Sequence, residues 1–324
     1  MQINRRFLYI GLFFITFGGV LLAARQGWVT ASAVASLWQL WPVLLIAIGL
    51  WIILSRRAAG WIGGVLVSVC LGAMAASVVQ GGVVPFVGCG GGETGFPFAT
   101  QEGELASQAE VDVAFSCGEL SVATGAGAAW SLSGSSSDGH VPDVERSDSG
   151  VSIESATRSF PFGGGRETWT LRIPTEPTID LGVTLNAGSG VVELDGAHLA
   201  DVHSTVNAGS LTLDLRGVEA ITDLGGTVNA GSSVTWLPEL SVEGSLTVNA
   251  GSLVICAPDD IGLRLNTGDN PISSNNFDQA GLVKTDSGWE TPDYGWAAVR
   301  TELDVTANAG SASLNPSQPC GGGD

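Results

Sequence analysis

Few residues in this chain have the type and spacing that catalysis or metal binding requires. His198 and His203 lie five positions apart in a predicted loop, and the third histidine, His140, is distant in sequence. A zinc site needs three or four ligands at suitable spacing. The sequence therefore predicts neither a metal site nor a bound cofactor.

A second arrangement, Asp195 and Asp214 with Arg216, has the residue types of a polysaccharide lyase. Such an enzyme needs clustered carboxylates to bind a cation and a basic residue to accept a proton. The chain has a single lysine, Lys284, and its arginines are scattered. The glycine-rich segments "GAGAAW" and "GCGGGE" do not stand between a strand and a helix, as a phosphate-binding loop must. We therefore predict that the protein is not an enzyme.

Residues 266–300 carry three aromatic side chains, Trp289, Tyr294 and Trp296. Aromatic rings on a loop can stack on the sugar rings of a cell-wall glycan or contact a protein partner. The same segment could instead fold back over the apolar end of a stack of repeats, which must be covered to remain soluble. Both interpretations stay open, and the acids among these rings are Asp269, Asp286, Glu290 and Asp293.

The cysteines indicate a disulfide in the second part of the chain. Cys89 and Cys320 are both flanked by glycines, one at each end of that part, and we predict that they pair. Four cysteines there allow three complete connectivities, so the alternatives remain open. Cys117 and Cys256 stand in strand patterns typical of buried side chains, and Cys70 lies in an apolar run.

Charge divides the chain into two regions. Residues 1–80 contain five arginines and no acid, whereas residues 81–324 hold all 32 acids against eight basic residues, a net charge of −24. Such a division implies two different environments. The acidic region also argues against nucleic acid as a partner, because its binders need positive charge to neutralise phosphates.

The first region contains three apolar runs, at about 7–24, 37–54 and 58–79. Each is long enough to cross a hydrocarbon core of roughly 30 Å. Basic residues stand before the first run and between the second and third, which predicts a cytoplasmic N-terminus and an extracytoplasmic C-terminal region. An alternative makes the first run a cleaved signal peptide, and it also places the later region outside the membrane.

The third run carries small residues at every fourth position. Such a stripe lets helix backbones approach closely. It can pack against the other two helices of the same chain, or it can mediate self-association or contact with a partner membrane protein. The stripe consists of Gly60, Gly64, Ser68, Gly72 and Ala76.

After this region the sequence "NAGS" occurs five times. The first four copies are spaced by 21, 22 and 20 residues, and the fifth follows a degenerate copy at Leu265 by about two periods. "FSCGELSVAT", from Phe115, is a degenerate earlier copy with Gly118 in the glycine position. A fixed period near this length indicates a stacked repeat architecture. We predict a linker at 81–103, a β-solenoid at 104–316 and a glycine-rich tail at 317–324.

Each copy is predicted to be a pair of strands around a corner. The residues after Ser alternate, as in Leu211, Thr212 and Leu213, and period two is typical of a strand with one buried face. Glycine can supply a positive φ at the corner, and the Asn amides can bond one another from coil to coil. Val234 and Trp236 take the apolar positions in the third copy, which predicts a bulge or slipped register there. The structural corner residues are Asn186, Asn207, Asn229, Asn249 and Asn308.

Two parts of the chain resemble a known family. The opening "YIGLFFITFGGVLLA", followed by "LWQLWPVLLIAIGLWIILSRR", resembles the membrane region of LiaI/LiaF-like bacterial envelope proteins. The repeats, with "WETPDYGWAAVRTELDVTANAGSASL", resemble the β-solenoid domains attached to that region. The resemblance implies a role in sensing or restraining cell-wall stress signals through contact with a membrane sensor kinase, or a role as an adhesin. The third apolar run and the longer repeat array depart from the compact regulators.

These observations predict a three-helix membrane anchor that carries an extracytoplasmic β-solenoid acting by binding. The leading function is envelope stress sensing or regulation, and the alternative is a surface structural or adhesive protein.

Overall fold

The computed structural model of the protein describes residues 11–19, 45, 65, 67–71, 95–137, 139–156, 166–267 and 274–320. The chain forms two compact units, Met1–Gly88 and Cys89–Asp324.

In the first unit, residues 11–19 and 67–71 are helical. Within the part of this unit that is described, no helix is both long and apolar enough to span a membrane. Most of the three predicted spans lies outside the described residues, and so do Gly60, Gly64, Gly72 and Ala76 of the small-residue stripe. Ser68 of that stripe is helical and buried.

The second unit is built from β strands. Its first seven strands are β1 Phe96–Pro97, β2 Gln101–Glu104, β3 Gln108–Gly125, β4 Ala129–Ser136, β5 Asp143–Ser147, β6 Gly150–Glu154 and β7 Glu167–Pro174. The strands that carry the first four "NAGS" copies are β8 Thr178–Glu193, β9 His198–Asp214, β10 Asp223–Trp236 and β11 Glu243–Cys256. The last strands are β12 Gly262–Asn266, β13 Val283–Lys284, β14 Gly288–Glu290, β15 Arg300–Ala307 and β16 Ser311–Leu314. Strand β1 and all of β2 except Glu104 therefore fall within the segment predicted to be a linker.

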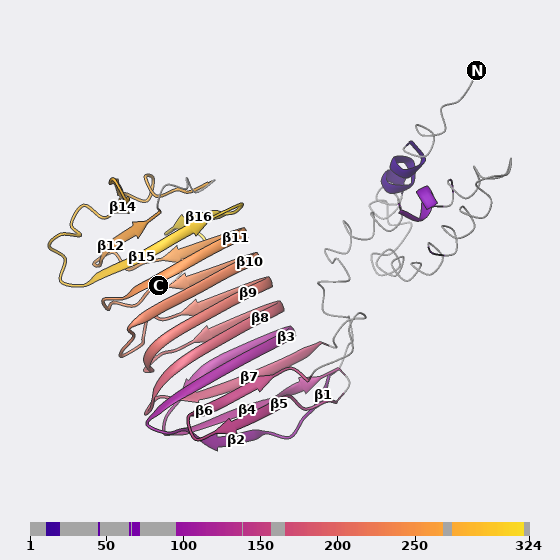
Figure 1. Cartoon of the computed structure of the whole chain (residues 1–324), viewed down its shortest axis with the longest axis horizontal. Helices are drawn as coiled ribbons and strands as arrows, with labels where there is room; N and C mark the ends of the chain where they lie inside the picture. Colours follow the sequence, from indigo (N-terminus) through magenta and orange to yellow (C-terminus); the bar gives the residue numbers. More distant parts are fainter. Residues whose placement is uncertain are drawn as a thin grey trace. The chain divides into compact units, whose positions relative to one another are not determined.

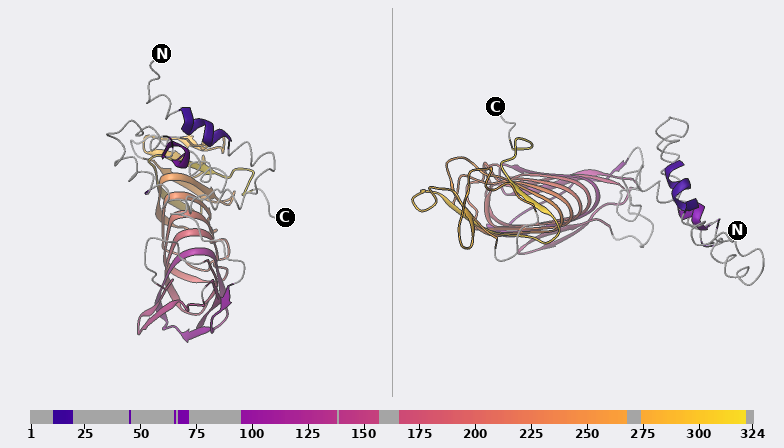
Figure 2. Two further views of the ribbon diagram at one scale, coloured as in Figure 1. Left: turned by 90° about the vertical axis from the view of Figure 1, so that its right-hand side faces the viewer. Right: turned by 90° about the horizontal axis from the view of Figure 1, so that it is seen from above.

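All sixteen strands belong to one sheet, whose main path is β1-β4-β7-β3-β8-β9-β10-β11-β15-β12-β14-β13. Neighbours from β3 to β11 are parallel, and so are β11 and β15 (Figure 1). We call β3, β8, β9, β10, β11 and β15 with its continuation β16 the parallel stack. Its long strands curve around a narrow interior (Figure 2).

The interior is filled by every second side chain of each strand. In β9, Leu199, Val202, Val206, Leu211 and Leu213 are at most 2% exposed. The corresponding residues of the other strands join them in one apolar cluster. Because one coil buries little by itself, each coil depends on its neighbours for stability.

The degenerate first copy has the register that the sequence predicts. Gly118 pairs with Gly188, which pairs with Gly209. Beyond β3, β7 and β4 close this end of the stack with two large buried side chains, Trp130 and Trp169. The short outer strands carry Pro97 and acids, which discourage pairing with another chain.

The third copy does not have the predicted bulge. β10 pairs with β9 and β11 in one unbroken register past the corner, from Ala230 to Trp236. Ser233 and Thr235 point inward and are 4% and 2% exposed, because β10 keeps the alternation of its neighbours even where this buries polar groups. The register shift between β8 and β9 lies elsewhere, between Ile179 and Leu181.

The last rung is placed differently from the sequence expectation. The sequence analysis placed a degenerate copy at Leu265, between the fourth and fifth copies in the order of the repeat. Instead, β15 lies directly against β11, and β12 lies outside β15. Asn308 donates a 2.8 Å hydrogen bond to Asn249, so the fifth copy is the next rung despite the long interval in sequence.

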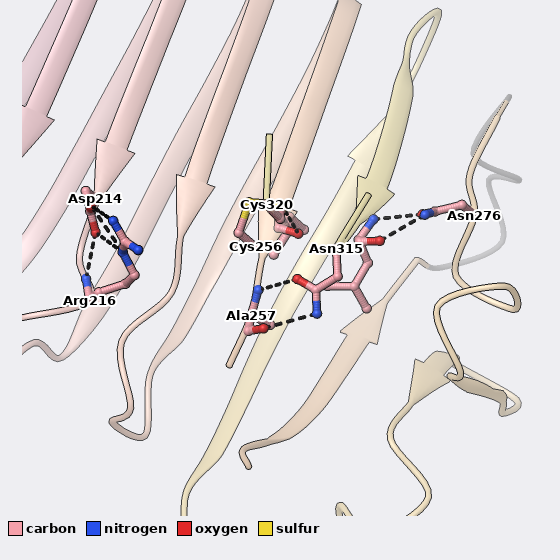
Figure 3. The surroundings of a disulfide bond; sticks show 9 residues. Asp214, Arg216, Cys256, Ala257, Asn276, Asn315 and Cys320 are labelled. Carbon is pink, nitrogen blue, oxygen red and sulfur yellow. Dashed lines mark hydrogen bonds and ion pairs between the residues drawn. A yellow bond between two sulfur atoms is a disulfide. The ribbon is translucent and has the colours of Figure 1, made fainter. Parts of the chain in front are cut away.

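The predicted Cys89–Cys320 disulfide is wrong. Cys320 pairs with Cys256, and their Cα atoms lie 5.4 Å apart (Figure 3). The chain after β16 turns back to the end of β11, where the Asn315 side chain bonds the N–H and C=O of Ala257 at 2.7 and 3.0 Å. Cys117 is disulfide-bonded as well, so neither it nor Cys256 is an unbonded buried thiol. Cys89 lies outside the described residues.

Candidate binding surface

The outward side chains of the parallel stack form rows that run from strand to strand. Glu110 is paired with Asp180, Asp201 with Asp223, and Glu243 with both Asp223 and Glu302. The backbone N–H of Asp201 also donates a 3.3 Å hydrogen bond to the carboxylate of Asp180. Adjacent strands lie about 4.8 Å apart, so neighbouring carboxylates repel one another. We call these six residues, Glu110, Asp180, Asp201, Asp223, Glu243 and Glu302, the acidic row.

A second row lies two residues further along each strand and contains two glycines. A Cβ atom on Gly182 would overlap the carboxylate of Asp112, and one on Gly225 would overlap the His203 imidazole. Asp112 and His203 therefore lie flat over the glycine of the next strand. The small residues leave a trough along the stack, and its hollow end is lined by Asp112, Ser152, Glu154, Thr184, His203 and Thr205.

The far side of the trough is a row of threonines. Thr205 pairs with Thr184 and Thr227, and Thr247 pairs with Thr227 and Thr306. Each hydroxyl can donate one hydrogen bond and accept others. The surface thus offers carboxylates on one side of the trough and hydroxyls on the other, a geometry suited to an extended ligand that lies lengthwise along the stack.

The predicted corner residues lie in one continuous ladder beside the threonines. Asn207 donates to Asn186, Asn229 to Asn207 and Asn249 to Asn229, each at 2.7 Å. Gly209 has a φ of 143°, and a Cβ atom there would overlap the carbonyl of Gly188. The corner therefore needs glycine both for its backbone conformation and for close packing between coils.

The three aromatic candidates have different environments. Trp289 on β14 is half-buried against the apolar cluster and contacts Phe277 edge-to-face, with ring centroids 6.2 Å apart. Tyr294 is buried, and its hydroxyl donates a 3.1 Å hydrogen bond to Glu302. Trp296 is 80% exposed. The structure therefore puts the first two in the packing at the end of the stack and leaves only Trp296 open to solvent.

A charged cluster joins this covering segment to β15, and the sequence did not indicate it. Arg264 lies 3.0 Å from Glu290 and 3.8 Å from Glu302, with its guanidinium 4.0 Å from the centroid of the Tyr294 ring. The hydrogen bond from Asn266 lowers the pKa of Glu302, and burial opposes this effect without cancelling it. Burial, followed by the hydrogen bond to Glu302, raises the pKa of Tyr294.

The residue types of a lyase do not assemble as a catalytic group. Arg216 bonds both carboxylate oxygens of Asp214, and its guanidinium lies 4.2 Å from the centroid of the Trp236 ring. Burial raises the pKa of Asp214, but the hydrogen bonds and charge of Arg216 outweigh burial and lower it. Asp195 lies beside Gly217, and its carbonyl accepts a 2.7 Å hydrogen bond from Thr124.

The histidines also differ from the predicted loop pair. His198 and His203 both stand on β9. His198 lies 3.0 Å from the carbonyl of Thr175 and 3.3 Å from the carboxylate of Glu219. Among the described residues, no group of three or more His, Cys, Asp or Glu side chains is arranged to hold a metal ion.

The acidic and threonine rows could have been found from the sequence. An acid stands six residues before Asn in all five copies, and a threonine stands two residues before it. Neither row was predicted, because both positions stand outside the invariant "NAGS" motif. The acidic position also varies between Asp and Glu. The Arg264 cluster gave no such signal, since its members come from β12, β14 and β15.

Comparison with known families gives two matches. Residues 9–87 match the LiaF transmembrane domain. Residues 97–233 match the N-terminal domain of toast_rack, DUF2154. The two matches confirm the resemblance to LiaF-like proteins, in the order of a LiaF transmembrane domain followed by a β-rich toast_rack domain.

Solved structures with some similarity include two from bacteria. A candidate cell adhesion protein from Clostridium sporogenes shares 13% identity, with a TM-score of 0.44, over 68% of this chain and 99% of that one. A candidate adhesin from Bacteroides fragilis shares 11% identity, with a TM-score of 0.27, over 67% of this chain and 96% of that one. A comparison with curated proteins gives no match.

Proposed function

We propose that this protein is a membrane-anchored, extracytoplasmic β-solenoid that acts by binding, in the sensing or regulation of cell-envelope stress. The main support for the proposal is that one chain combines a match to the LiaF transmembrane domain with a parallel stack that has a regular polar face. Neither matched description names a reaction, and Arg216 and Arg264 are engaged in ion pairs with Asp214 and Glu290.

The proposed topology has three membrane spans, a cytoplasmic N-terminus and the β unit outside. Disulfides at Cys117 and Cys256 support an oxidising compartment, because such bonds are rare in the cytosol. A reporter active only outside the membrane should give signal when fused after Gln80 and none after Arg57. The reverse pattern would overturn the topology.

The proposed partners follow from this arrangement. The membrane region contacts lipid and, through the stripe of Gly60, Gly64, Ser68, Gly72 and Ala76, a membrane sensor kinase or a second copy of the chain. The trough beside the acidic row contacts an extended ligand such as a cell-wall glycan. Binding along the trough then changes how the membrane helices meet their partner.

A second candidate function is adhesion or a structural role at the surface, and the exposure of Trp296 favours it. The two functions differ in what they require of the anchor. A regulator needs its own helices, whereas an adhesin should work on a foreign one.

The test replaces residues 1–80 with an unrelated three-span anchor of the same topology and measures an envelope-stress reporter and surface attachment. Regulation predicts that the reporter response is lost although the β unit is displayed at wild-type level. A retained reporter response, with attachment dependent on Trp296, would replace regulation by adhesion. The matched control is the wild-type chain with the same tag.

A further inference from the structure

A small open pocket lies at the opposite end of strand β10 from the acidic row. Asp223 is the first residue of β10 and Trp236 is its last, and the Trp236 ring borders the pocket. Its apolar lining consists of Leu237, Ala257 and Pro258, which follow β10 and β11. The volume is about 180 Å³, below the roughly 300 Å³ at which pockets for drug-sized ligands begin. We call this space the Trp236 pocket.

Trp236 is an exception in its row of the stack. It is paired with Asp214 on β9 and with Cys256 on β11, and Asp214 is paired with Glu193 on β8. Thr235 points inward and is buried, so the next side chain, Trp236, points outward. The ring is partly exposed and does not belong to the apolar cluster of the interior. A large aromatic ring in this position does not fill the core, so its apolar surface can contact a ligand.

The Trp236 ring and the guanidinium beside it are held in place. The guanidinium of Arg216 lies 4.2 Å from the centroid of the ring. Its Nε and Nη2 atoms donate hydrogen bonds of 3.0 and 2.6 Å to the carboxylate of Asp214 (Figure 3). Bonds from two nitrogens to one carboxylate fix the plane of the guanidinium as well as its position.

The part of the lining that follows β11 is also held in place. The Asn315 side chain bonds both the N–H and the C=O of Ala257 (Figure 3). Cys256, the residue before Ala257, is joined to Cys320 by a disulfide. A site that is fixed before the ligand arrives loses little conformational freedom on binding. The Trp236 pocket is therefore preorganised.

Three polar groups at the pocket keep hydrogen-bonding capacity. Asp214 takes the Nε and Nη2 atoms of Arg216, which leaves the N–H groups of Nη1 for another acceptor. Among the described residues, neither the indole N–H of Trp236 nor the carboxylate of Glu239 has a hydrogen-bond or ion-pair partner. The pocket therefore offers donors and an acceptor beside an aromatic ring.

We propose that the Trp236 pocket binds one neutral pyranose unit of a glycan, with an apolar face of the sugar against the Trp236 ring. The sugar hydroxyls accept hydrogen bonds from Arg216 and donate to Glu239. Glu239 repels an anion, since Asp214 already neutralises Arg216, and the Arg216 guanidinium repels a cation. A purely apolar ligand would cover these polar groups without satisfying them. The pocket is separate from the trough, so the inference does not depend on the proposed stress-sensing function.

The test titrates sugars into the full-length chain in dodecylphosphocholine micelles, because a detergent with a sugar head group would compete. Tryptophan is replaced by fluorotryptophan, and the fluorine NMR signal of Trp236 is the one that is absent from Trp236→Phe. The neutral probes are methyl glucoside and the tetramer of N-acetylglucosamine, and the charged probes are glucuronate and glucosamine. We expect the neutral sugars to shift the Trp236 signal until it saturates.

Saturation-transfer NMR on the sugar then compares the affinities of the variants. Trp236→Leu should weaken binding about tenfold, which corresponds to about 1.4 kcal/mol, because it removes the aromatic face. Trp236→Phe keeps an aromatic ring and should bind more tightly than Trp236→Leu. Glu239→Gln should weaken binding severalfold, because it removes a charged acceptor. Asp260→Asn, at an exposed position that does not line the pocket, is the matched control and should bind as the wild type does.

Three results would overturn the proposal. The first is that none of the sugars shifts the Trp236 signal, and the second is that Trp236→Leu binds the neutral sugars as tightly as the wild type. The third is tighter binding of glucuronate or glucosamine than of the neutral sugars. If Trp236→Leu fails to fold, Glu239→Gln is compared with Asp260→Asn, and equal affinities of these two variants would contradict the proposal in the same way.

Discussion

The side-chain amide of Asn229 donates a 2.7 Å hydrogen bond to the Oδ1 atom of Asn207, and its own Oδ1 accepts an identical bond from Asn249. Bonds of this kind connect all five Asn residues of the repeat in one direction. Aligned hydrogen bonds polarise one another, so the ladder is expected to be cooperative. The Asn residues differ in how many hydrogen bonds they make in the ladder: an interior Asn makes two, and a terminal Asn makes one.

This difference gives a prediction about position in the ladder. Asn229→Ala leaves a donor on Asn249 and an acceptor on Asn207 without partners, whereas Asn308→Ala interrupts only the bond to Asn249. We expect a loss of about 1–3 kcal/mol for Asn229→Ala and a smaller one for Asn308→Ala. Urea unfolding of the wild type and the two variants measures this. Equal midpoints for the two variants would contradict the dependence on position, and midpoints equal to that of the wild type would show that the ladder does not stabilise the stack.

The corner glycine gives a second prediction. Gly209→Val forces a β-branched residue to adopt a φ of 143° and places its Cβ against the carbonyl of Gly188. Backbone strain alone costs on the order of 1–3 kcal/mol, and the overlap adds to it. Ser210→Ala, at the next and exposed position, is the control and should change the unfolding free energy little. Thermal melts that coincide for these two variants would contradict the corner conformation.

Much of the stack follows from local patterns. Alternating apolar residues fix which face of β9 is buried, and the period of "NAGS" fixes which residues become neighbours, so Thr205 must lie between Thr184 and Thr227 once the copies are aligned. The degenerate copy at Gly118 could be placed for the same reason. The alternation and the spacing are properties of a single repeated coil, so they can be recognised in one sequence.

The end of the stack could not be predicted in this way. Sequence order suggested that the segment after Leu265 precedes the fifth copy in space, but β15 pairs with β11 and displaces β12 outward. The segments that form β12 and β15 have similar patterns, so the pattern alone does not determine which of them lies against β11. The pairing of Cys320 with Cys256 depends on this outcome, because the tail reaches β11 only when β16 lies beside it.

The charged cluster at this end gives a prediction about pH. The pKa of Glu302 in the folded state lies below its ordinary value of 4.5, mainly because Asn266 donates a hydrogen bond to it. A carboxyl with a lowered pKa stabilises the fold fully above its unfolded pKa and loses that contribution as the pH falls through the folded value. Glu302→Gln should therefore lose less stability than the wild type when the pH falls below about 4.5.

Melting temperatures measured from neutral to acid pH check this expectation. Tyr294→Phe is a useful companion, because it removes one hydrogen bond to Glu302 and leaves the carboxyl able to titrate. Its curve should keep the downward slope at acid pH, whereas that of Glu302→Gln should be flatter there. Parallel curves for the wild type and Glu302→Gln would show that this carboxyl does not contribute.

Trp289 and Trp296 give the last prediction, because residues only seven positions apart in the sequence lie in opposite environments. The Trp289 ring packs on the apolar cluster and on Phe277, with Lys284 above it, 5.9 Å from its centroid. Trp296 follows a tight turn, in which its N–H bonds the carbonyl of Asp293, and its side chain is 80% exposed. Truncation should therefore have unequal effects on stability.

Trp289→Ala should cost about 2–3 kcal/mol, less than the roughly 3–5 kcal/mol of a fully buried tryptophan because its ring is only half-buried. Trp296→Ala should stay within about 0.5 kcal/mol of the wild type, as is usual for an exposed side chain. Denaturant unfolding gives both values, and attachment of displayed cells or retention on cell-wall glycan gives the binding readout. A ring this exposed gains free energy only by contact with something outside the chain, so unchanged binding in Trp296→Ala would remove the observation that favours adhesion. Loss of binding in Trp289→Ala at unchanged stability would contradict the packing role of that residue.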